Sequence, residues 1–408
     1  MSMMFKVKTL PFPFPAIIRF FRGNVKFSLV FGANYAKIMR MNEHLQGAER
    51  AEALSMLPSL LLPWYDTNKR DLPWRENTDP YRVWVSEIML QQTRVEAARE
   101  HYVRFLRELP TVEALAACPE DRLLKLWEGL GYYSRARNLQ KAAGIVAAEG
   151  FPRTAAGWKK LPGIGDYTAG AIASIAFGER APAVDGNVIR VLSRLLGDGR
   201  PAETLKGAFF RELEPALPRA RCGDFTQSLM ELGATVCTPA APLCPRCPLF
   251  PLCRTRGDAL PLPRKKPERR RSEMTLLLFC RGDEAALCRR GDGVLRGMYG
   301  FFAVERAMNE AAVRAFLQEA GMRAFALGRA KAHKHVFSHL EWEMTAYPVR
   351  SDEDARALRG AAGAAHTPFG ALEYFPVEKI AREISLPSAF RWCLPLLQAS
   401  APQGGAEK

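Results

Sequence analysis

Residues 161–170 read LPGIGDYTAG, an apolar-Gly-apolar-Gly turn between two stretches of helical pattern. Two glycines so close together allow a tight hairpin, because glycine accepts backbone angles that other residues avoid. The hairpin would expose backbone amides at the start of the following helix, where the helix dipole favours a phosphate group. Taken alone, the pattern is more often a helix-helix turn without a function, so the flanking segments have to decide.

Helical periodicity surrounds this hairpin on both sides. From about residue 49 to 235 amphipathic stretches alternate with Gly and Pro, and no alternating strand pattern of comparable length occurs. This predicts a mainly α region. The expected helices cover residues 51–68, 80–106, 111–116, 119–128, 134–149, 166–176 and 184–196.

Four of the nine cysteines gather directly after the helical region, in the spacing C-x6-C-x2-C-x5-C. The other five are scattered, which is unlike the even framework of a small disulfide-bonded domain. Four thiolates at this spacing suit either Zn²⁺ or a [4Fe–4S] cluster, and spacing alone does not choose between them. The expected ligands are Cys237, Cys244, Cys247 and Cys253.

Basic residues concentrate in two segments of a chain whose formal net charge is +15. Residues 1–42 carry seven Lys or Arg and no acidic residue, and residues 254–272 carry eight against two acidic residues. Such segments either bind a polyanion or remain as solvated tails. No apolar run reaches the ~20 residues that a membrane-spanning helix needs. We expect no membrane association, and we expect residues 1–48 to be an extension outside the fold.

The pattern changes after the Pro-rich basic segment 254–272, which is typical of a linker. Residues 274–281 (MTLLLFCR) and 285–289 predict strands around a short turn, and residues 340–349 alternate apolar with polar side chains. Helices expected at 309–320 and 376–384 complete an α+β domain.

Two carboxylates stand in motifs on either side of the hairpin. Asp185 lies in AVDGNVIRV (183–191), about twenty residues after the hairpin, at a position typical of a helix N-cap. Glu87 lies in WVSEIMLQQTRV (84–95) between apolar residues, so we expect it at the edge of a buried stripe. A partly desolvated carboxyl group keeps its proton to higher pH, which suits a general acid. An ordinary N-cap and an ordinary boundary glutamate are the structural alternatives.

With these motifs in place, the chain resembles the MutY-type adenine DNA glycosylases of the helix-hairpin-helix, endonuclease III superfamily. The resemblance covers roughly residues 50–400 and rests on six segments in the family's order. They are RDLPWR (70–75), WVSEIMLQQTRV (84–95), GLGYYSRARNL (129–139), LPGIGDYTAGAI (161–172), VDGNVIRV (184–191) and the cysteine loop (237–253).

The resemblance implies a function and a set of roles. Glu87 would protonate adenine at N7, and Asp185 would stabilise the oxocarbenium-like sugar with help from Asn187. The substrate would be duplex DNA in which adenine is mispaired with 8-oxoguanine or guanine, and the adenine would be flipped out of the helix. A [4Fe–4S] cluster is the implied cofactor. The implied DNA-binding residues are Arg70, Arg75, Gln92, Thr93, Tyr132 as a wedge, and Gly163, Gly165 and Tyr167 of the hairpin, with Arg246, Arg254 and Arg256 as phosphate contacts.

Tyr167 separates two kinds of relative. Bifunctional members of the superfamily carry a lysine there, which attacks the sugar through a Schiff base. With Tyr167 in its place, the resemblance implies a monofunctional hydrolase with little or no lyase activity. An endonuclease III-like glycosylase acting on oxidised pyrimidines is the enzymatic alternative, and a DNA-binding module without activity is the other.

The C-terminal domain resembles a Nudix fold. Gly300, Arg314, Glu319 and Gly321 match the Nudix box, but Arg306, Ala315 and Gln318 replace three of its glutamates. A carboxylate Mg²⁺ site does not survive that loss, so we expect no pyrophosphohydrolase activity. In MutY-type proteins such a domain reads 8-oxoguanine. The implied recognition loop here is Phe337, Ser338 and His339.

The predicted organisation has six parts. The predicted catalytic region consists of a helical glycosylase domain of two lobes together with an iron–sulfur loop. The α+β Nudix-like domain follows after a linker. We expect a cytoplasmic monomer, with targeting through residues 1–42 and protein partners at the linker left open. The parts are residues 1–48, 49–236, 237–253, 254–272, 273–400 and 401–408.

Overall fold

The computed structural model describes residues 47–262, 268–353, 355 and 369–398. The predicted tail and nearly all of the predicted N-terminal extension lie outside these described residues. None of the described helices is long and apolar enough to cross a membrane.

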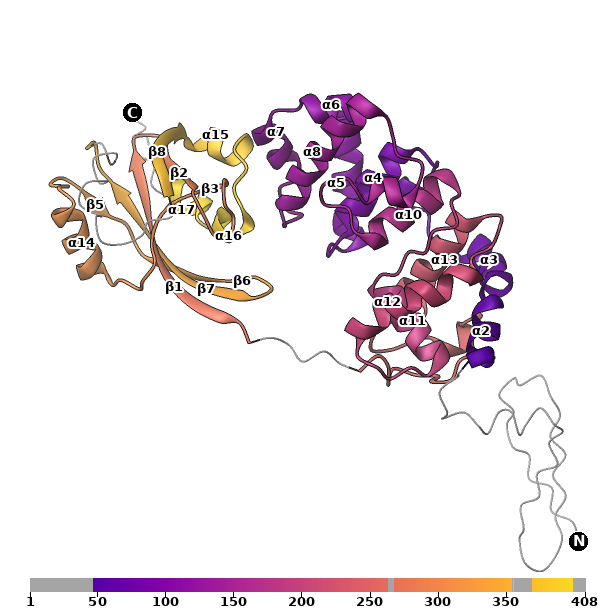
Figure 1. Ribbon diagram of the computed structural model, residues 1–408. Coiled ribbons are helices and arrows are strands. Elements are labelled where there is room, and N and C mark those ends of the chain that lie inside the picture. Colours follow the sequence, from indigo (N-terminus) through magenta and orange to yellow (C-terminus); the bar gives the residue numbers. More distant parts are fainter. Residues whose placement is uncertain (1–46, 263–267, 354, 356–368, 399–408) are drawn as a thin grey trace, which may run out of the picture. The chain divides into compact units, whose positions relative to one another are not determined.

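One helical lobe is built from a continuous stretch of chain (Figure 1). Its core buries large aromatic side chains, among them Trp84, Trp127 and Trp158, and burial of such side chains is the main stabilising contribution to a lobe of this size. Helix α4 begins where Asp79 accepts a hydrogen bond from the amide of Arg82, with Pro80 at the first helical position. The elements are η1 (Pro73–Arg75), α4 (Pro80–Leu90), α5 (Val95–Glu108), α6 (Val112–Ala117), α7 (Glu120–Leu126), α8 (Ser134–Glu149), α9 (Ala155–Trp158) and α10 (Asp166–Phe177).

The second helical lobe is discontinuous in sequence. Two N-terminal helices pack with three helices that follow the first lobe, around a core that includes Leu57, Phe209 and Phe225. The expected two-lobed helical region is thereby confirmed. The elements are α2 (Gly47–Ser55), α3 (Leu57–Asn68), α11 (Gly186–Leu196), α12 (Ala202–Leu213), η2 (Glu214–Ala216), α13 (Cys222–Thr235) and η3 (Cys244–Arg246).

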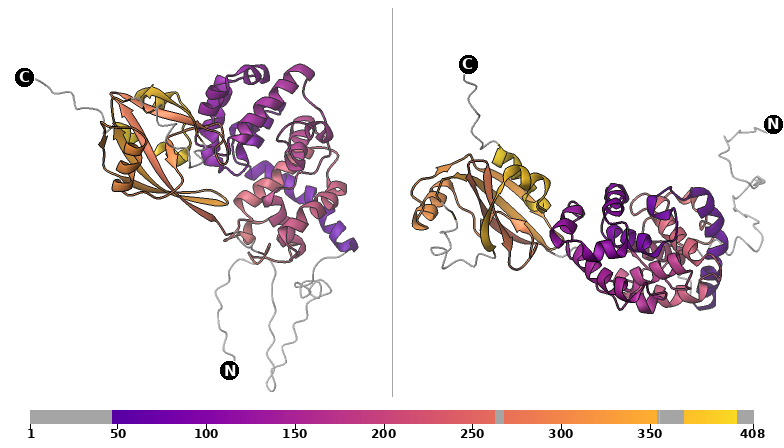
Figure 2. Two further views of the ribbon diagram at one scale, coloured as in Figure 1. Left: turned by 60° about the vertical axis from the view of Figure 1, so that its left-hand side comes forward. Right: turned by 90° about the horizontal axis from the view of Figure 1, so that it is seen from above.

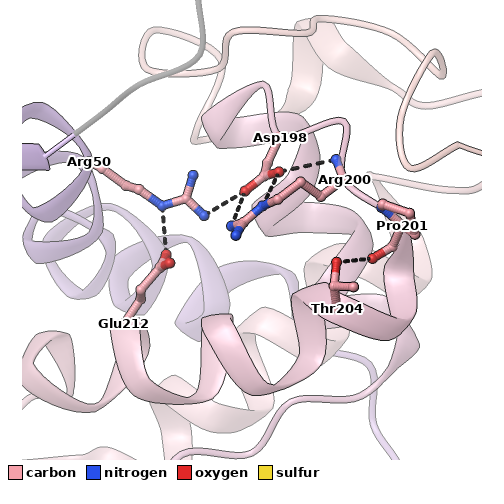
Figure 3. A network of polar contacts seen from close by, with 6 residues as sticks. All are labelled: Arg50, Asp198, Arg200, Pro201, Thr204 and Glu212. Carbon is pink, nitrogen blue, oxygen red and sulfur yellow. Dashed lines mark hydrogen bonds and ion pairs between the residues drawn. The ribbon is translucent and has the colours of Figure 1, made fainter.

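A charged network fastens helix α2 to this second lobe (Figure 3). The guanidinium of Arg50 donates to Glu212 at 2.6 Å and to Asp198 at 2.8 Å. Arg200 donates to the same Asp198 carboxylate. Burial of Asp198 would raise its pKa, but the hydrogen bonds from Arg200 and Arg50 outweigh burial and hold the pKa well below its ordinary value. The carboxylate therefore stays ionised and keeps the N-terminal helix in place.

The C-terminal region is a mixed eight-stranded sheet with helices on both sides (Figure 1 and Figure 2). Strand β1 pairs in parallel with β7, while the other pairings are antiparallel. This confirms the expected α+β domain. The strands are β1 (Arg270–Arg281), β2 (Glu284–Arg290), β3 (Tyr299–Gly300), β4 (Phe302–Val304), β5 (Ala326–Leu327), β6 (Lys331–Val336), β7 (Leu340–Arg350) and β8 (Phe369–Pro376), and the helices are α14 (Glu310–Glu319), α15 (Val377–Arg382), α16 (Ser388–Arg391) and α17 (Leu394–Gln398).

Strand β1 is buried on both faces. Leu276 and Leu278 belong to the core that contacts α15, α16 and α17, whereas Leu277 and Phe279 belong to the core beneath α14. A strand covered on both faces reads as a continuous apolar run rather than an alternating one. This explains the sequence MTLLLFCR.

Several predicted boundaries differ from the structure. The stretch 51–68 is divided at Met56 into α2 and α3, and β1 begins at Arg270, inside the range predicted as linker. The single helix expected over 80–106 is wrong, since the chain breaks between α4 and α5 at residues 91–94. Gln92 takes a left-handed conformation there, with φ of 56°. No Gly or Pro occurs at this break. The apolar periodicity on both sides therefore predicted one continuous helix.

Candidate active site between the two helical lobes

A cavity of about 720 Å³ lies where the two helical lobes meet. Its walls come from η1, α4 and α10 of the first lobe and from α11 and α13 of the second. It collects both predicted catalytic carboxylates, their predicted helper Asn187 and five of the eleven predicted substrate residues. Those lining it are Glu87, Asp185, Asn187, Arg70, Arg75, Gln92, Thr93 and Tyr167.

Glu87 presents a buried carboxyl group to this cavity from helix α4. The residue is 7% exposed, and the hydroxyl of Tyr167 donates to its Oε2 at 2.9 Å. Burial raises the pKa of Glu87 to about 7; the Tyr167 hydrogen bond lowers it and the nearby charge of Asp185 raises it further. Glu87 can therefore hold or release a proton near neutral pH, as a general acid requires.

Asp185 is at once the N-cap of helix α11 and a wall of the cavity. Its Oδ1 accepts from the amide of Val188 at 2.8 Å, and its Oδ2 accepts from the Asn187 side chain at 2.9 Å. Burial raises the pKa of Asp185, while these hydrogen bonds oppose the rise. The structural and the functional interpretation of this residue are thus compatible, because the capping contacts also orient the carboxylate.

Two glycines bring Asp185 into position. A Cβ at Gly170 on α10 would lie 2.0 Å from the carbonyl oxygen of Pro182, so only glycine lets the segment before Asp185 pack against that helix. A Cβ at Gly233 on α13 would lie 2.6 Å from the Cβ of Asn187. The close packing of α10 and α13 against the start of α11, which carries Asp185, therefore depends on these two glycines.

Glu231 is a cavity residue that the sequence did not predict. It lies on α13, fully buried, and binds both predicted arginines. Arg70 donates to it through Nε at 2.8 Å and Nη2 at 3.0 Å, and Arg75 donates at 2.7 Å. Burial would raise the pKa of Glu231, but the hydrogen bonds from Arg70 and Arg75 outweigh it and hold the pKa at about 2. Glu231 is therefore a permanent anion that orients two cavity-lining arginines.

The two hairpin glycines, Gly163 and Gly165, lie outside the cavity lining, whereas Tyr167 directly after them is part of it. Gly163 has φ of 78°, and a Cβ there would lie 2.8 Å from the Cβ of Asn138, so both backbone angle and space require glycine. Gly165 is the N-cap of α10 and has no side chain to cap the helix. The first amides of α10 consequently remain available for an external acceptor. Asp166 in that first turn pairs with Lys159 at 2.5 Å, which offsets its charge.

The four clustered cysteines line one cavity of about 20 Å³. Within the described residues, no three His, Cys, Asp or Glu side chains converge as ligands of one metal ion. The guanidinium of Arg194 donates to the Cys237 thiol at 3.4 Å, and Arg190 donates to the Cys237 carbonyl at 2.7 Å. Arg256, expected to contact phosphate, instead stacks over Phe250 and lines the same cavity.

The remaining predicted DNA contacts lie on loops. Tyr132 is 46% exposed in the loop before α8, and the Phe337–His339 turn joins β6 to β7. Phe337 packs edge-on against His335 and Trp342, and Ser338 lies 3.2 Å from the Nδ1 of His339. Tyr132 and this turn line one cavity of about 560 Å³.

The chain is similar in sequence to known DNA glycosylases. Adenine DNA glycosylases of Arabidopsis thaliana and Homo sapiens are 47% and 50% identical over 224 and 210 residues, 48% of this chain in each case. The matches cover only 36% and 38% of those relatives, so the chain spans well under half their length. A relative from Buchnera aphidicola with the same description is 38% identical, over 45% of this chain and 53% of its own.

Among solved structures, a thermostable thymine-DNA glycosylase is 31% identical with a TM-score of 0.46, over 50% of this chain and 95% of its own. The model of the HhH-GPD superfamily of base excision DNA repair proteins matches residues 85–212, the stretch that contains Glu87, the hairpin and Asp185. Residues 85–212, less than half of the chain, are therefore similar to the HhH-GPD superfamily of base excision DNA repair proteins.

Proposed function

We propose that the protein is an adenine DNA glycosylase that hydrolyses the N-glycosidic bond of adenine opposite 8-oxoguanine or guanine. The single observation that carries the proposal is the pairing in one cavity of the buried Glu87, whose pKa is about 7, with the half-buried Asp185. Two carboxyl groups in different protonation states are what the cleavage of a glycosidic bond requires. The choice of adenine as the base that is removed comes from the similarity to adenine DNA glycosylases.

In the proposed reaction Glu87 donates its proton to adenine, which makes the base a neutral leaving group. Asp185 remains ionised and stabilises the positive charge that develops on the sugar, before water attacks. Asn187, which donates to the Asp185 carboxylate, keeps that charge directed at the sugar. Arg70 and Arg75, held by Glu231, contact the extruded base.

The proposed enzyme lacks lyase activity. Tyr167 stands where bifunctional relatives carry their lysine nucleophile, and its hydroxyl donates to Glu87. A phenol cannot form a Schiff base with the opened sugar. Lys206, an exposed residue at the cavity lining, is the one lysine in that lining, so strand cleavage without alkali has to be measured directly.

The four cysteines would hold a [4Fe–4S] cluster, which when bound would cross-link the loop 237–253. Two observations support a shared group at this place: all four side chains line one small cavity, and their spacing resembles that of the cluster loop of MutY-type relatives. In such a cluster each thiolate binds a different iron atom. Arg194, which already donates to the Cys237 thiol, would then partly neutralise the charge of the thiolates.

The proposed selectivity for 8-oxoguanine rests on the C-terminal domain. Tyr132 and Phe337–His339 line one cavity, which joins an exposed aromatic ring to a polar turn. Tyr132 would enter the base stack, and Ser338 and His339 would offer hydrogen bonds to the oxidised base.

The test is single-turnover base release from duplexes containing 8-oxoguanine:A, G:A or thymine glycol:A, each with and without alkali. We expect release of adenine from the first duplex, faster than from G:A, with strand cleavage only after alkali treatment. Release of the oxidised pyrimidine with spontaneous strand cleavage would assign the protein to endonuclease III-like enzymes. Binding without release of any base would make it a lesion-binding module.

A further inference from the structure

Arg135, in the first turn of helix α8, binds the backbone of two separate loops. Its Nη1 donates to the carbonyls of Ile88 at 2.8 Å, Met89 at 3.0 Å and Gln91 at 2.6 Å. These are the last carbonyls of α4, which no intrahelical amide satisfies. A cation at the carboxyl end of a helix is also favoured by the helix dipole. The same guanidinium therefore caps the helix that carries Glu87.

The other terminal nitrogen of Arg135 holds the second loop. Nη2 donates to the carbonyls of Leu130 at 2.9 Å and Gly131 at 3.1 Å, and it lies 3.3 Å from the Thr93 hydroxyl of the first loop. The guanidinium also lies over two aromatic rings, 5.4 Å from the centroid of Trp127 and 5.7 Å from that of Tyr132. Both loops thus depend on one planar group.

The charge of Arg135 has no acidic partner among the described residues. Backbone carbonyls, one hydroxyl and two rings form its surroundings. Desolvation lowers the pKa of Arg135 to about 10, which leaves it protonated at neutral pH. An ionised, half-buried group with no counter-ion is costly to the fold. The hydrogen bonds of Arg135 to the two loops offset part of this cost.

The two loops share an unusual backbone geometry. Gln92 and Tyr132, which occupy their tips, are both exposed and both left-handed, with φ of 56° and 48°. For residues other than glycine this region costs on the order of 1 kcal/mol or more and persists only where the surroundings enforce it. The carbonyls held by Arg135 belong to the residues directly before these two tips, Gln91 and Gly131.

We propose that Arg135 is a positioning residue for base extrusion: it holds Gln92 and Tyr132 in one fixed frame, so that both tips enter the duplex together. The inference deepens the proposed function and rests on it. Arg135 itself touches no substrate. It sets the rate at which adenine leaves the stack, while Glu87 and Asp185 set the rate of bond cleavage.

A lysine at position 135 provides the sharpest test. R135K keeps the positive charge but has one point donor, so it cannot serve both loops in the way that a planar fork does. Extrusion would be followed by stopped-flow fluorescence of 2-aminopurine placed opposite 8-oxoguanine. Adenine release would be measured under single-turnover conditions on paired adenine and on adenine in an unpaired bulge. The matched control is R104K, which alters an exposed arginine that donates one bond to the carbonyl of Leu126.

We expect R135K to slow the fluorescence change and the release of paired adenine by about tenfold or more. Release from the bulge should fall less than about threefold, with the same pH dependence as the unaltered protein, and R104K should change nothing. An equal loss on both substrates would show a general structural role and overturn the inference, as would an unchanged rate of extrusion.

A second variant covers the case in which R135K fails to fold. W127F keeps Arg135 but replaces the indole under it by a smaller ring and removes the indole donor to the Gly131 carbonyl. We expect the same selective slowing, about two- to fivefold, and equal slowing on both substrates would contradict the inference. The arms also separate the two proposals. If the unaltered protein extrudes 2-aminopurine but releases no adenine, the proposed function fails and the positioning role is still measured; without extrusion the inference falls.

Discussion

The two sides of the active-site cavity each bury one glutamate, with opposite results. On the α4 side Glu87 accepts a hydrogen bond from the neutral hydroxyl of Tyr167 and pairs with no guanidinium of the described residues, so burial dominates and its pKa rises to about 7. On the α13 side Glu231 is buried at least as deeply, yet two guanidiniums hold its pKa at about 2. Burial alone therefore does not set the protonation state of a carboxyl group; the partners do. One cavity can hold a proton donor and a permanent anion side by side.

The largest expected effect comes from removing the proton donor. E87Q keeps the shape of the side chain but cannot protonate adenine, so we expect single-turnover adenine release to fall by about 10²–10⁴-fold. Binding to an 8-oxoguanine:A duplex, measured by fluorescence anisotropy, should change little. If E87Q released adenine at close to the normal rate, the division of roles between the two sides of the cavity would be wrong.

Removing the permanent anion should act on stability first. E231Q leaves Arg70 and Arg75 buried against a neutral group, so we expect the free energy of unfolding to drop by about 3–5 kcal/mol in chemical denaturation. The matched control is E212Q, whose carboxylate pairs with Arg50 and is partly exposed. That variant should lose only about 1 kcal/mol. Equal losses in the two variants would remove the distinction between a buried anchor and a surface pair.

The pH dependence of stability should have opposite signs at the two glutamates. Because the pKa of Glu87 is raised on folding, its ionisation costs the fold free energy as pH rises from about 4.5 through 7. E87Q should therefore be more stable than the unaltered protein at pH 8, by on the order of 3 kcal/mol, and similar to it at pH 4.5. The depressed pKa of Glu231 contributes stability above about pH 4.5, which is lost as pH falls towards 2. Thermal melts of E87Q that show no such pH-dependent difference would contradict the comparison.

The smallest expected effect comes from removing the hydrogen bond that Tyr167 donates to Glu87. Y167F removes the hydrogen bond that favours ionised Glu87, so the pKa of Glu87 should rise. In the proposed reaction adenine release requires the protonated acid, so we expect it to decline above pH 7 in the unaltered protein. In Y167F the midpoint of this decline should move to higher pH, with a rate change at pH 7 of about fivefold or less, since one hydrogen bond contributes ~1 kcal/mol. A midpoint that moves to lower pH would show that Tyr167 does not act as the donor.

Sequence reasoning reached the two lobes and the α+β domain because these follow from local patterns. It also reached eight residues of the cavity lining, among which Arg70, Gln92 and Thr93 were predicted from the family resemblance alone. Hairpin glycines, an N-cap aspartate and helical periodicity are all readable over short stretches. Glu231 was missed because α13 was not predicted and because no local pattern distinguishes a buried glutamate from a boundary one. Its identity depends on Arg70 and Arg75, which are about 160 residues away in the chain.

The break between α4 and α5 was missed for the same reason. Gln92 is left-handed, and Arg135, more than forty residues later, donates to the carbonyl of the residue directly before it. The sequence QQTR contains no residue that ends a helix by itself. Backbone conformations that depend on contacts with residues far away in the sequence cannot be predicted from local periodicity.

The second helical lobe carries a consequence for synthesis of the chain. Its helices α2 and α3 leave the ribosome first, but their partners α11, α12 and α13 follow only after the whole of the first lobe. Since closing a long loop costs chain entropy, the first lobe can assemble from its own contiguous residues while α2 and α3 wait with their apolar faces uncovered. The cavity between the lobes, and with it the pairing of Glu87 and Asp185, is therefore completed late. We expect a nascent chain that stalls before residue 235 to expose the apolar faces of α2 and α3, which favours aggregation.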